Sequence, residues 1–194
     1  GLHYRHCAVY DKSAVHHRTD NSEHGGLDRN NKTDKIWNPL FTTIFIANAC
    51  MNLSQQMMNS LASKYNQGLL VRRHQHHSYD FTAKMEFAPR DYCHMAGLVC
   101  YYNYDNNYYL NMSVDDEGKP YVMVNVSVNK EISQSEKVYL GENKDPVYLK
   151  AEVRERNVTF FVSQDGTSYT QVGEVLDMRN LSDERVDGNG FAGA

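Results

Sequence analysis

The sequence predicts an all-β fold, an antiparallel β-sandwich, and three observations lead to this fold class. Apolar and polar residues alternate with a period of two after residue 67. Turn-forming residues recur there at short, regular intervals, and the chain contains no Rossmann fingerprint, Walker loop or sustained amphipathic helix. Short antiparallel strands with such turns are typical of a sandwich, with a barrel as the alternative. With 194 residues and 41% apolar content, the chain can bury one sizeable core.

The part of the chain before residue 60 has little regular pattern. Residues 1–34 are polar, contain scattered glycines and show no period, so they stay unassigned, with disorder as one reading. Residues 35–59 form an irregular lead-in, whose apolar stretch IWNPLFTTIFIANACMNL is interrupted by a proline and is compatible with one or two strands. Methionines and leucines from Met51 to Leu61 recur at loosely helical spacing, which is compatible with a short helix. The sandwich itself is expected over residues 60–194.

Alternation marks the expected strands in chain order. In YDFTAKMEF, residues 79–87, every second residue is apolar, which is the pattern of a half-buried strand. MAGLVCYYNY and NYYLNMSV follow as hairpin partners joined at Asp105-Asn106, and DDEGKP turns the chain. Residues 121–128, VYLKAEV and VTFFVS are the next expected strands. SQDGTSYTQVG is a hairpin with Asp165-Gly166 at its tip.

Charge and hydropathy disfavour two classes of partner. The chain carries 20 basic and 24 acidic residues, a net charge of -4, and has no block of one sign. Nucleic acid and anionic membranes are therefore not expected as partners. No apolar run approaches the roughly 18 residues of a membrane span, and the start GLHYRHCAVY lacks the regions of a signal peptide. A soluble chain is expected. The absence of an initiator methionine is compatible with a piece of a longer protein, and the cellular location stays unknown.

Cysteine spacing and glycosylation motifs add little about function. The four cysteines are Cys7, Cys50, Cys93 and Cys100. They have no CxxC or CxxH spacing, so we expect free, mostly buried thiols and no zinc knuckle or redox pair. Asn-x-Ser/Thr motifs occur at several positions, including Asn31, Asn52, Asn111, Asn125 and Asn157. Such motifs are common by chance in an Asn-rich chain, so they do not decide the compartment.

A histidine cluster in LLVRRHQHHSYDF is the first candidate for a metal site. On a strand, His74 and His76 would point to one face and His77 to the other, so at most two of the three could share an ion. Arg72 would share the face of the first two and repel a cation. We therefore expect the cluster to be the solvated face of a strand, and we assign no metal ligand.

Catalytic patterns are equally weak. No serine lies in a GxSxG elbow and no Cys–His pair has a recognisable local signature. The conspicuous acidic residues are Asp115, Asp116, Glu117, Asp165, Asp183, Glu184 and Asp187. Most fall in expected turns, where carboxylates hydrogen-bond their own backbone, so we assign no catalytic residue. A self-sufficient enzyme would need two facing carboxylates in a cleft.

The densest aromatic run in the chain has two readings. It consists of Tyr101, Tyr102, Tyr104, Tyr108 and Tyr109. Such rings can form a platform on which a sugar stacks, but a sandwich also needs them for cross-strand pairs and for a core with polar tips. Packing is the favoured interpretation, and the sugar platform stays open.

The order of several segments resembles a known family. SLASKYNQGLLVRRHQHHSYDFTAKMEF, then MAGLVCYYNYDNNYYLNMS, then PVYLKAEVRERNVTFFVSQDG, LSDE and the closing GFAGA resemble the C-terminal concanavalin-like β-sandwich of glycoside hydrolase family 43 xylosidases. The resemblance covers about residues 60–194. It implies a jelly-roll, concanavalin A-like fold.

This resemblance implies a function located mostly outside the chain. In the family, a five-bladed propeller carries three catalytic carboxylates and releases xylose, and in many members arabinose, from xylo-oligosaccharides. No propeller is identifiable here, so the chain is expected to be an accessory module of a β-xylosidase or arabinofuranosidase, inactive alone. Its expected partners are that propeller and the xylo-oligosaccharide substrate, and a homo-oligomer is left open.

One residue is a candidate for substrate contact. The family's sandwich sends a loop across the mouth of the active site near a Gly-Phe-Thr-Gly-Ala motif, which Gly190–Ala194 matches with Ala192 in place of threonine. Phe191 is therefore expected to form an apolar wall of the pocket that excludes water, or, as the alternative, to be a core phenylalanine.

Departures from the family keep other readings open. The family continues into another strand where this sequence ends, so the sandwich is expected to be incomplete at its C-terminus. SQQMMN stands where the family has a Leu-Arg-Leu-Tyr-Gly-type strand, and residues 1–34 match nothing in it. No cofactor is expected, apart from a structural calcium suggested by analogy with similar sandwiches. The alternative function is a stand-alone carbohydrate-binding, lectin-like module.

Overall fold

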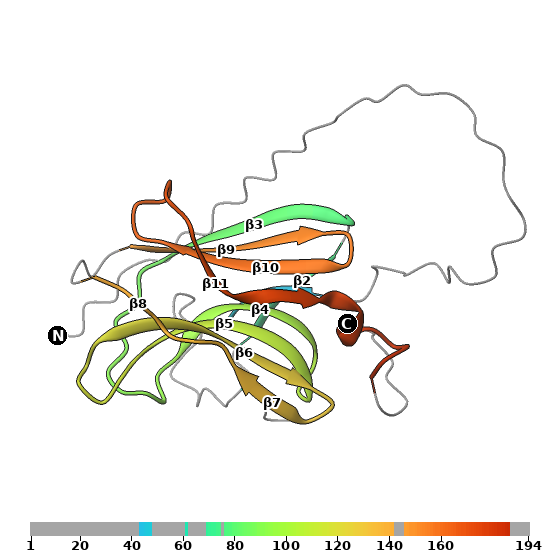
Figure 1. Cartoon of the computed structure of the whole chain (residues 1–194), viewed down its shortest axis with the longest axis horizontal. Helices are drawn as coiled ribbons and strands as arrows, with labels where there is room; N and C mark the ends of the chain where they lie inside the picture. The colour runs from blue at the N-terminus through green and yellow to red at the C-terminus, as the bar shows by residue number, and fades with distance from the viewer. Residues whose placement is uncertain (1–42, 48–60, 62–68, 75, 142–145, 187–194) are drawn as a thin grey trace, which may run out of the picture.

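The protein is built from two stacked antiparallel β-sheets. The structure, a computed structural model, describes residues 43–47, 61, 69–74, 76–141 and 146–186. Its strands are β1 (Thr43–Ala47), β2 (Leu69–Arg73), β3 (Ser78–Met85), β4 (Ala96–Asn103), β5 (Asn106–Val114), β6 (Pro120–Val128), β7 (Glu131–Gln134), β8 (Val138–Tyr139), β9 (Val147–Arg154), β10 (Asn157–Ser163) and β11 (Thr170–Asp177). One short 3-10 helix, η2 (Met178–Leu181), follows β11. Figure 1 shows the two layers.

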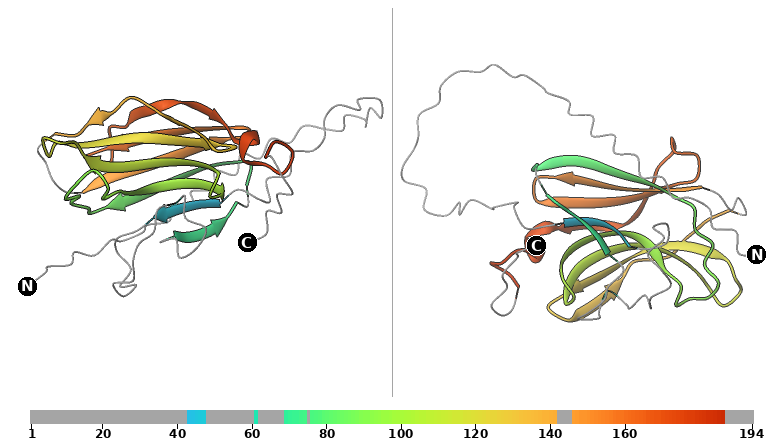
Figure 2. Two further views of the ribbon diagram at one scale, coloured as in Figure 1. Left: turned by 90° about the horizontal axis from the view of Figure 1, so that it is seen from below. Right: turned by 180° about the vertical axis from the view of Figure 1, so that it is seen from behind.

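Strands that are distant in sequence lie side by side in both sheets. The seven-stranded sheet has the order β2-β1-β4-β5-β6-β7, with β8 also paired to β6, and the four-stranded sheet has the order β11-β10-β9-β3. Figure 2 shows β1 and β2 at one margin of the larger sheet. All the pairings are antiparallel. The predicted β-sandwich class is confirmed.

Alternation along the strands places one large core between the sheets. In β9, buried Val147, Leu149, Ala151 and Val153 alternate with partly exposed residues. Their side chains meet a buried set from the facing sheet, namely Leu98, Cys100, Tyr108, Leu110, Met112, Val122 and Val124. Burying a Leu or Val side chain contributes about 1.5–3 kcal/mol. This contact between the sheets is therefore the main stabilising feature of the fold.

The central strand of the larger sheet is buried on both faces, which alternation did not predict. Every residue of β5 is buried. On the face away from the main core, Tyr109 forms a second apolar cluster with Val99, and Leu61, Leu69 and Met95 pack against this pair. Strand β5 has a neighbour on each edge and side chains over both faces, so its polar residues are buried as well.

Two expected turns form for the predicted reason. The Asp115 carboxylate accepts hydrogen bonds from the backbone N–H groups of Glu117 (3.0 Å) and Lys119 (2.8 Å). Asp165 accepts from the backbone N–H groups of Thr167 and Ser168, both at 2.7 Å. These bonds lower the pKa of both carboxyl groups. The acidic residues at these positions are turn formers, as expected.

The prediction for the histidine cluster is wrong in two respects. Strand β2 ends at Arg73 and β3 begins at Ser78, so the histidines lie in the connection between them and not on a strand. His74 is only 4% exposed, whereas His76 and His77 are exposed. Strand periodicity cannot place side chains where the strand is interrupted, and the connection turns His74 inward.

Further expectations have mixed outcomes. Cys100 is a buried free thiol, as predicted, but Cys93 is exposed. Of the one or two strands allowed in the lead-in, β1 is described, while the helix considered around Met51–Leu61 lies largely outside the described residues. In the described part of the chain, no helix has the length and apolar character needed to cross a membrane.

Candidate functional site

The candidate functional site is the segment Asp177–Val186, which leads from β11 toward Gly190–Ala194. Phe191 and the rest of that motif lie outside the described residues. The segment comes shortly before this motif in the sequence, and the structure describes it as far as Val186. Met178 and Leu181 are 0% exposed and Val186 is 7% exposed, so the segment is tied to the core by its apolar side chains.

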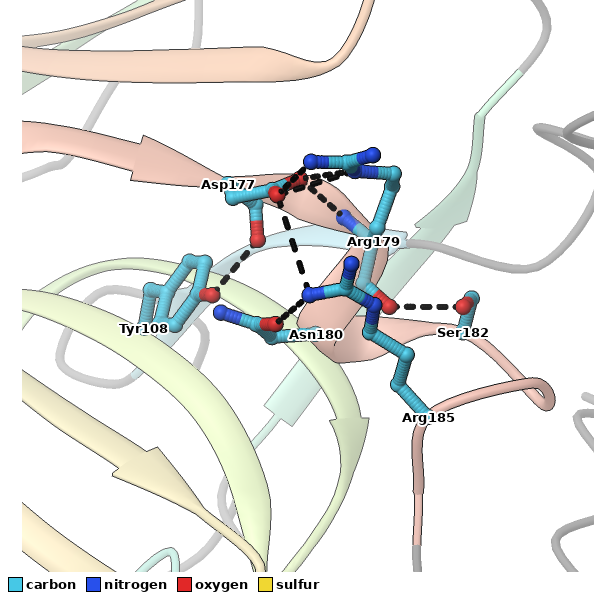
Figure 3. A network of polar contacts seen from close by, with 6 residues as sticks. All are labelled: Tyr108, Asp177, Arg179, Asn180, Ser182 and Arg185. Carbon is cyan, nitrogen blue, oxygen red and sulfur yellow. Dashed lines mark hydrogen bonds and ion pairs between the residues drawn. The ribbon is translucent and has the colours of Figure 1, made fainter.

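Asp177 organises the start of this segment (Figure 3). Its carboxylate caps η2 by accepting a hydrogen bond from the backbone N–H of Arg179 at 2.9 Å. The same carboxylate forms an ion pair with the Arg179 guanidinium, with a shortest distance of 2.5 Å, and lies 4.0 Å from the guanidinium of Arg185. The hydrogen bonds and charge of Arg179 lower the pKa of Asp177. Asp177 is therefore ionised at neutral pH.

Hydrogen bonds join the segment to the larger sheet. The Tyr108 hydroxyl on β5 donates to the backbone oxygen of Asp177 at 2.7 Å (Figure 3). The Tyr102 hydroxyl on β4 donates to the Asp183 carboxylate. Asn129, in the turn after β6, donates its side-chain amide to the backbone oxygen of Arg185 at 3.2 Å. The segment is thus held by residues from three places in the larger sheet.

Tyrosines of the run from Tyr101 to Tyr109 pack in the core or attach this segment to the sheet, in preference to forming an open platform for a sugar. Tyr108 and Tyr109 are buried, at 1% and 7% exposure, in the two different apolar clusters. Burial raises the pKa of Tyr108 to about 12, so its hydroxyl stays protonated and can donate to Asp177. Tyr102 is partly buried and engaged with Asp183. Packing, the favoured interpretation, accounts for these three residues.

The described residues offer little for acid–base or metal chemistry. Asp115, Asp116 and Glu117 line a shallow depression with Lys119 and Tyr139. The Asp115 carboxylate is occupied by backbone N–H groups, and Glu117 pairs with Lys119 at 2.6 Å. Among the residues that the structure describes, no group of three or more His, Cys, Asp or Glu side chains is placed to hold a metal ion. A structural calcium stays a prediction.

The sequence analysis did not single out Asp177, which organises the segment Asp177–Val186 and its attachment to the sheet, here called the anchor. Asp183, Glu184 and Asp187 were singled out as turn acids, but Asp177 was not. A signal was present, since an aspartate directly before MRNL is typical of a helix N-cap. The ion pair with Arg179 adds to the cap, and the sequence alone does not show that Tyr108 donates to the same residue.

The fold and this anchor define a class of protein, a concanavalin A-like β-sandwich module whose last described segment is fixed at one end of the larger sheet. The profile of the family described as "Beta xylosidase C-terminal Concanavalin A-like domain" matches residues 38–194. The chain therefore belongs to this family of beta-xylosidase C-terminal domains. The earlier resemblance is confirmed.

Curated relatives agree with this assignment. The chain is 33% identical over 125 residues to a xylan 1,3-beta-xylosidase of a Vibrio species, a match that covers 64% of the chain and 23% of the relative. It is 28% identical over 134 residues to a beta-xylosidase of Bacillus subtilis, covering 68% of the chain and 25% of the relative. The chain spans about a quarter of the length of these relatives.

Solved structures show the same fold. The xylan beta-1,4-xylosidase from Bacillus halodurans matches with a TM-score of 0.66 and 27% identity, over 70% of this chain and 26% of that one. A GH43 protein from Bacillus licheniformis matches with a TM-score of 0.63 and 25% identity, over 69% of this chain and 25% of that one. Again the match is to about a quarter of a larger enzyme.

Asparagine at position 177 tests the ion pair separately from the cap. Because an Asn side chain also caps helices, Asp177→Asn should cost about 1 kcal/mol or less at pH 7, whereas Asp177→Ala should cost about 1–2 kcal/mol. In the folded protein the pKa of Asp177 is lowered from its ordinary value of 3.8. The ionised carboxylate therefore stabilises the fold at pH values above 3.8, and this contribution is lost as the pH falls through the pKa of the folded state. Urea unfolding at pH 7 and pH 3 measures both effects. A wild-type advantage over Asp177→Asn that is unchanged at pH 3 would contradict the ion pair.

Proposed function

We propose that the chain is the accessory β-sandwich of a family 43 β-xylosidase and closes the active site of a catalytic propeller that lies outside its 194 residues. The family assignment and the length of the relatives support this proposal. The observation that carries it furthest is the anchored segment Asp177–Val186. It comes shortly before the motif that contains Phe191 in the sequence, and Tyr108 and Asn129 hold it to the larger sheet by hydrogen bonds.

The chemistry assigned to the chain is positioning and exclusion of water. Phe191 would provide an apolar wall beside the sugar, which lowers the local dielectric and strengthens the electrostatic interactions of the propeller carboxylates. Tyr102, Tyr108 and Asp177 are positioning residues that act through the segment. The proposed substrates are xylo-oligosaccharides, with arabinofuranosides as a second class.

A chimeric enzyme tests the proposal directly. Residues 38–194 would replace the matching quarter of the Bacillus halodurans xylosidase, and kcat/KM would be measured with nitrophenyl xyloside and nitrophenyl arabinoside. The chimera should have a higher kcat/KM than the propeller alone. Phe191→Ala should lower the kcat/KM of the chimera by about tenfold or more, since a contact that excludes water acts mainly in the transition state. The melting temperature of each variant serves as the control for folding.

Two results would count against the proposal. One is equal kcat/KM for the chimera and its Phe191→Ala variant, both well folded, which would remove the role in pocket closure. The other is hydrolysis of either substrate by the isolated chain, which would place the catalytic groups within these residues.

A stand-alone carbohydrate-binding module is the second candidate, because aromatic side chains gather on the outer face of the four-stranded sheet. Phe161 and Tyr169 flank Lys150, with the Lys150 ammonium 5.6 Å and 5.2 Å from the two ring centroids. A side chain at Gly166 would meet the ring of Tyr148 at 3.1 Å, so this ring is already covered by the hairpin. The rings of Phe161, Tyr169 and Tyr148 are thus already in contact with other parts of the protein. Titration of the isolated chain with xylo-oligosaccharides distinguishes the candidates, since tight binding that Phe161→Ala abolishes would support the module.

A further inference from the structure

The connection between β2 and β3 joins the two sheets at one side of the sandwich. Strand β2 is an edge strand of the larger sheet, and β3 is an edge strand of the smaller one. His74 follows β2 directly and is 4% exposed. It forms a hydrogen bond through Nε2 with the Tyr79 hydroxyl on β3, and the two rings meet edge to face with centroids 4.6 Å apart. This pair therefore bridges the margins of the two sheets.

The surroundings of His74 suit a neutral imidazole and not an imidazolium. Its Nδ1 is buried and has no hydrogen-bond partner. Its charged form would be opposed by His77 and His76, which follow it in the connection. Tyr79 has a raised pKa because it is buried, with Cys100 on β4 as a second cause, so it supplies no negative charge. Arg154 on β9 donates to the backbone oxygen of Tyr79 at 3.1 Å, and its charge is balanced by the Asp80 carboxylate 2.6 Å away.

We propose that the His74–Tyr79 pair is an acid-sensitive latch, which holds β2 and the following connection against β3 while His74 is neutral and releases them when His74 is protonated. An imidazolium would need an acceptor at each ring nitrogen, and Nδ1 has none. Opening the connection gives the charged ring access to water. Strand β2 pairs only with β1 among the described strands, so it can open without disturbing the pairing of β4, β5 and β6.

The sign of the pH dependence follows from two protonation equilibria. Burial, followed by the charges of His77 and His76, lowers the pKa of His74 from 6.5 to about 4 in the closed state. In the open state the pKa should return to its ordinary value of about 6.5. Between these values the open form binds more protons, so acid favours opening. The pKa values of the closed and open states predict that the equilibrium constant for opening rises about twentyfold between pH 7 and pH 5.

Hydrogen exchange of the whole chain, followed by mass spectrometry and corrected for intrinsic rates, measures this opening. Between pH 7 and pH 5, protection of peptides that cover residues 69–78 should fall about twentyfold, while β5 and β6 keep theirs. His74→Gln keeps a neutral hydrogen-bonding side chain and should remove the pH dependence. His76→Gln, an exposed neighbour, should retain it.

Other outcomes overturn the latch. Equal loss of protection in all strands would show global unfolding instead of local release. An unchanged pH dependence in His74→Gln would assign the effect to another group. Where His74→Gln fails to fold, the NMR titration of the His74 ring in the wild-type chain decides, because titration near pH 6.5 with β2 still protected would rule out the latch.

Discussion

Replacing Gly97 by alanine is expected to destabilise the protein by about 3 kcal/mol or more, because an added methyl group has no space there. A Cβ atom at this position would lie 1.9 Å from the backbone oxygen of Leu110 and 2.8 Å from Cα of Asn111. Both atoms belong to the backbone of β5, which is paired with β4 along its length. Neither can move away unless the two central strands separate.

Urea unfolding at pH 7 measures this effect, and Gly118→Ala provides the matched control. Gly118 lies in the turn after β5 with φ of 78° and has no atom within 4 Å of an added Cβ. This control should cost only about 1 kcal/mol, from the strain of the left-handed backbone. If Gly97→Ala is no more destabilising than Gly118→Ala, the close approach of β4 and β5 is wrong.

Phe160→Ala is expected to lower the free energy of unfolding by about 3–5 kcal/mol, which is typical when a fully buried phenylalanine becomes alanine. Phe160 is 0% exposed and belongs to the main core between the sheets. It lies opposite Ala151 on β9 and Val172 on β11, whose side chains are also buried. The cavity could not be filled by solvent, because both sheets cover it.

The adjacent residue tests which face of β10 is buried. Phe161 lies on the outer face, opposite Lys150, and is only partly buried. Phe161→Ala should therefore cost about 1 kcal/mol, including the lost contact with the Lys150 ammonium. Thermal and urea unfolding of both variants compare the two faces directly. Equal costs, or a larger cost for Phe161→Ala, would mean that the register of β10 is shifted by one residue.

Local patterns were sufficient to predict most of the strands. Alternation marked β3, β6, β9 and β10, because the side chains of consecutive strand residues point to opposite faces. Asp115 and Asp165 were predicted as turn residues because a carboxylate and nearby backbone N–H groups form hydrogen bonds within a few residues. These interactions involve neighbours in sequence, and the sequence shows those neighbours directly.

Features that depend on distant neighbours could not be predicted in the same way. His74 was expected to be solvated, and its burial depends on the path of the chain from one sheet to the other. The candidate site joins Tyr102 to Asp183 and Tyr108 to Asp177, pairs that are 81 and 69 residues apart. Nothing in the pattern around either tyrosine identifies its partner.

The amino-acid order alone was enough for the fold class, most strand positions and, through quoted motifs, the family. The folded chain decided which strands pair, why β5 is covered on both faces, and how the segment before Phe191 is held. The physical reason is that side-chain period and turn chemistry act over a few residues. Burial and hydrogen-bond partners are instead set by which sheets and loops meet in space.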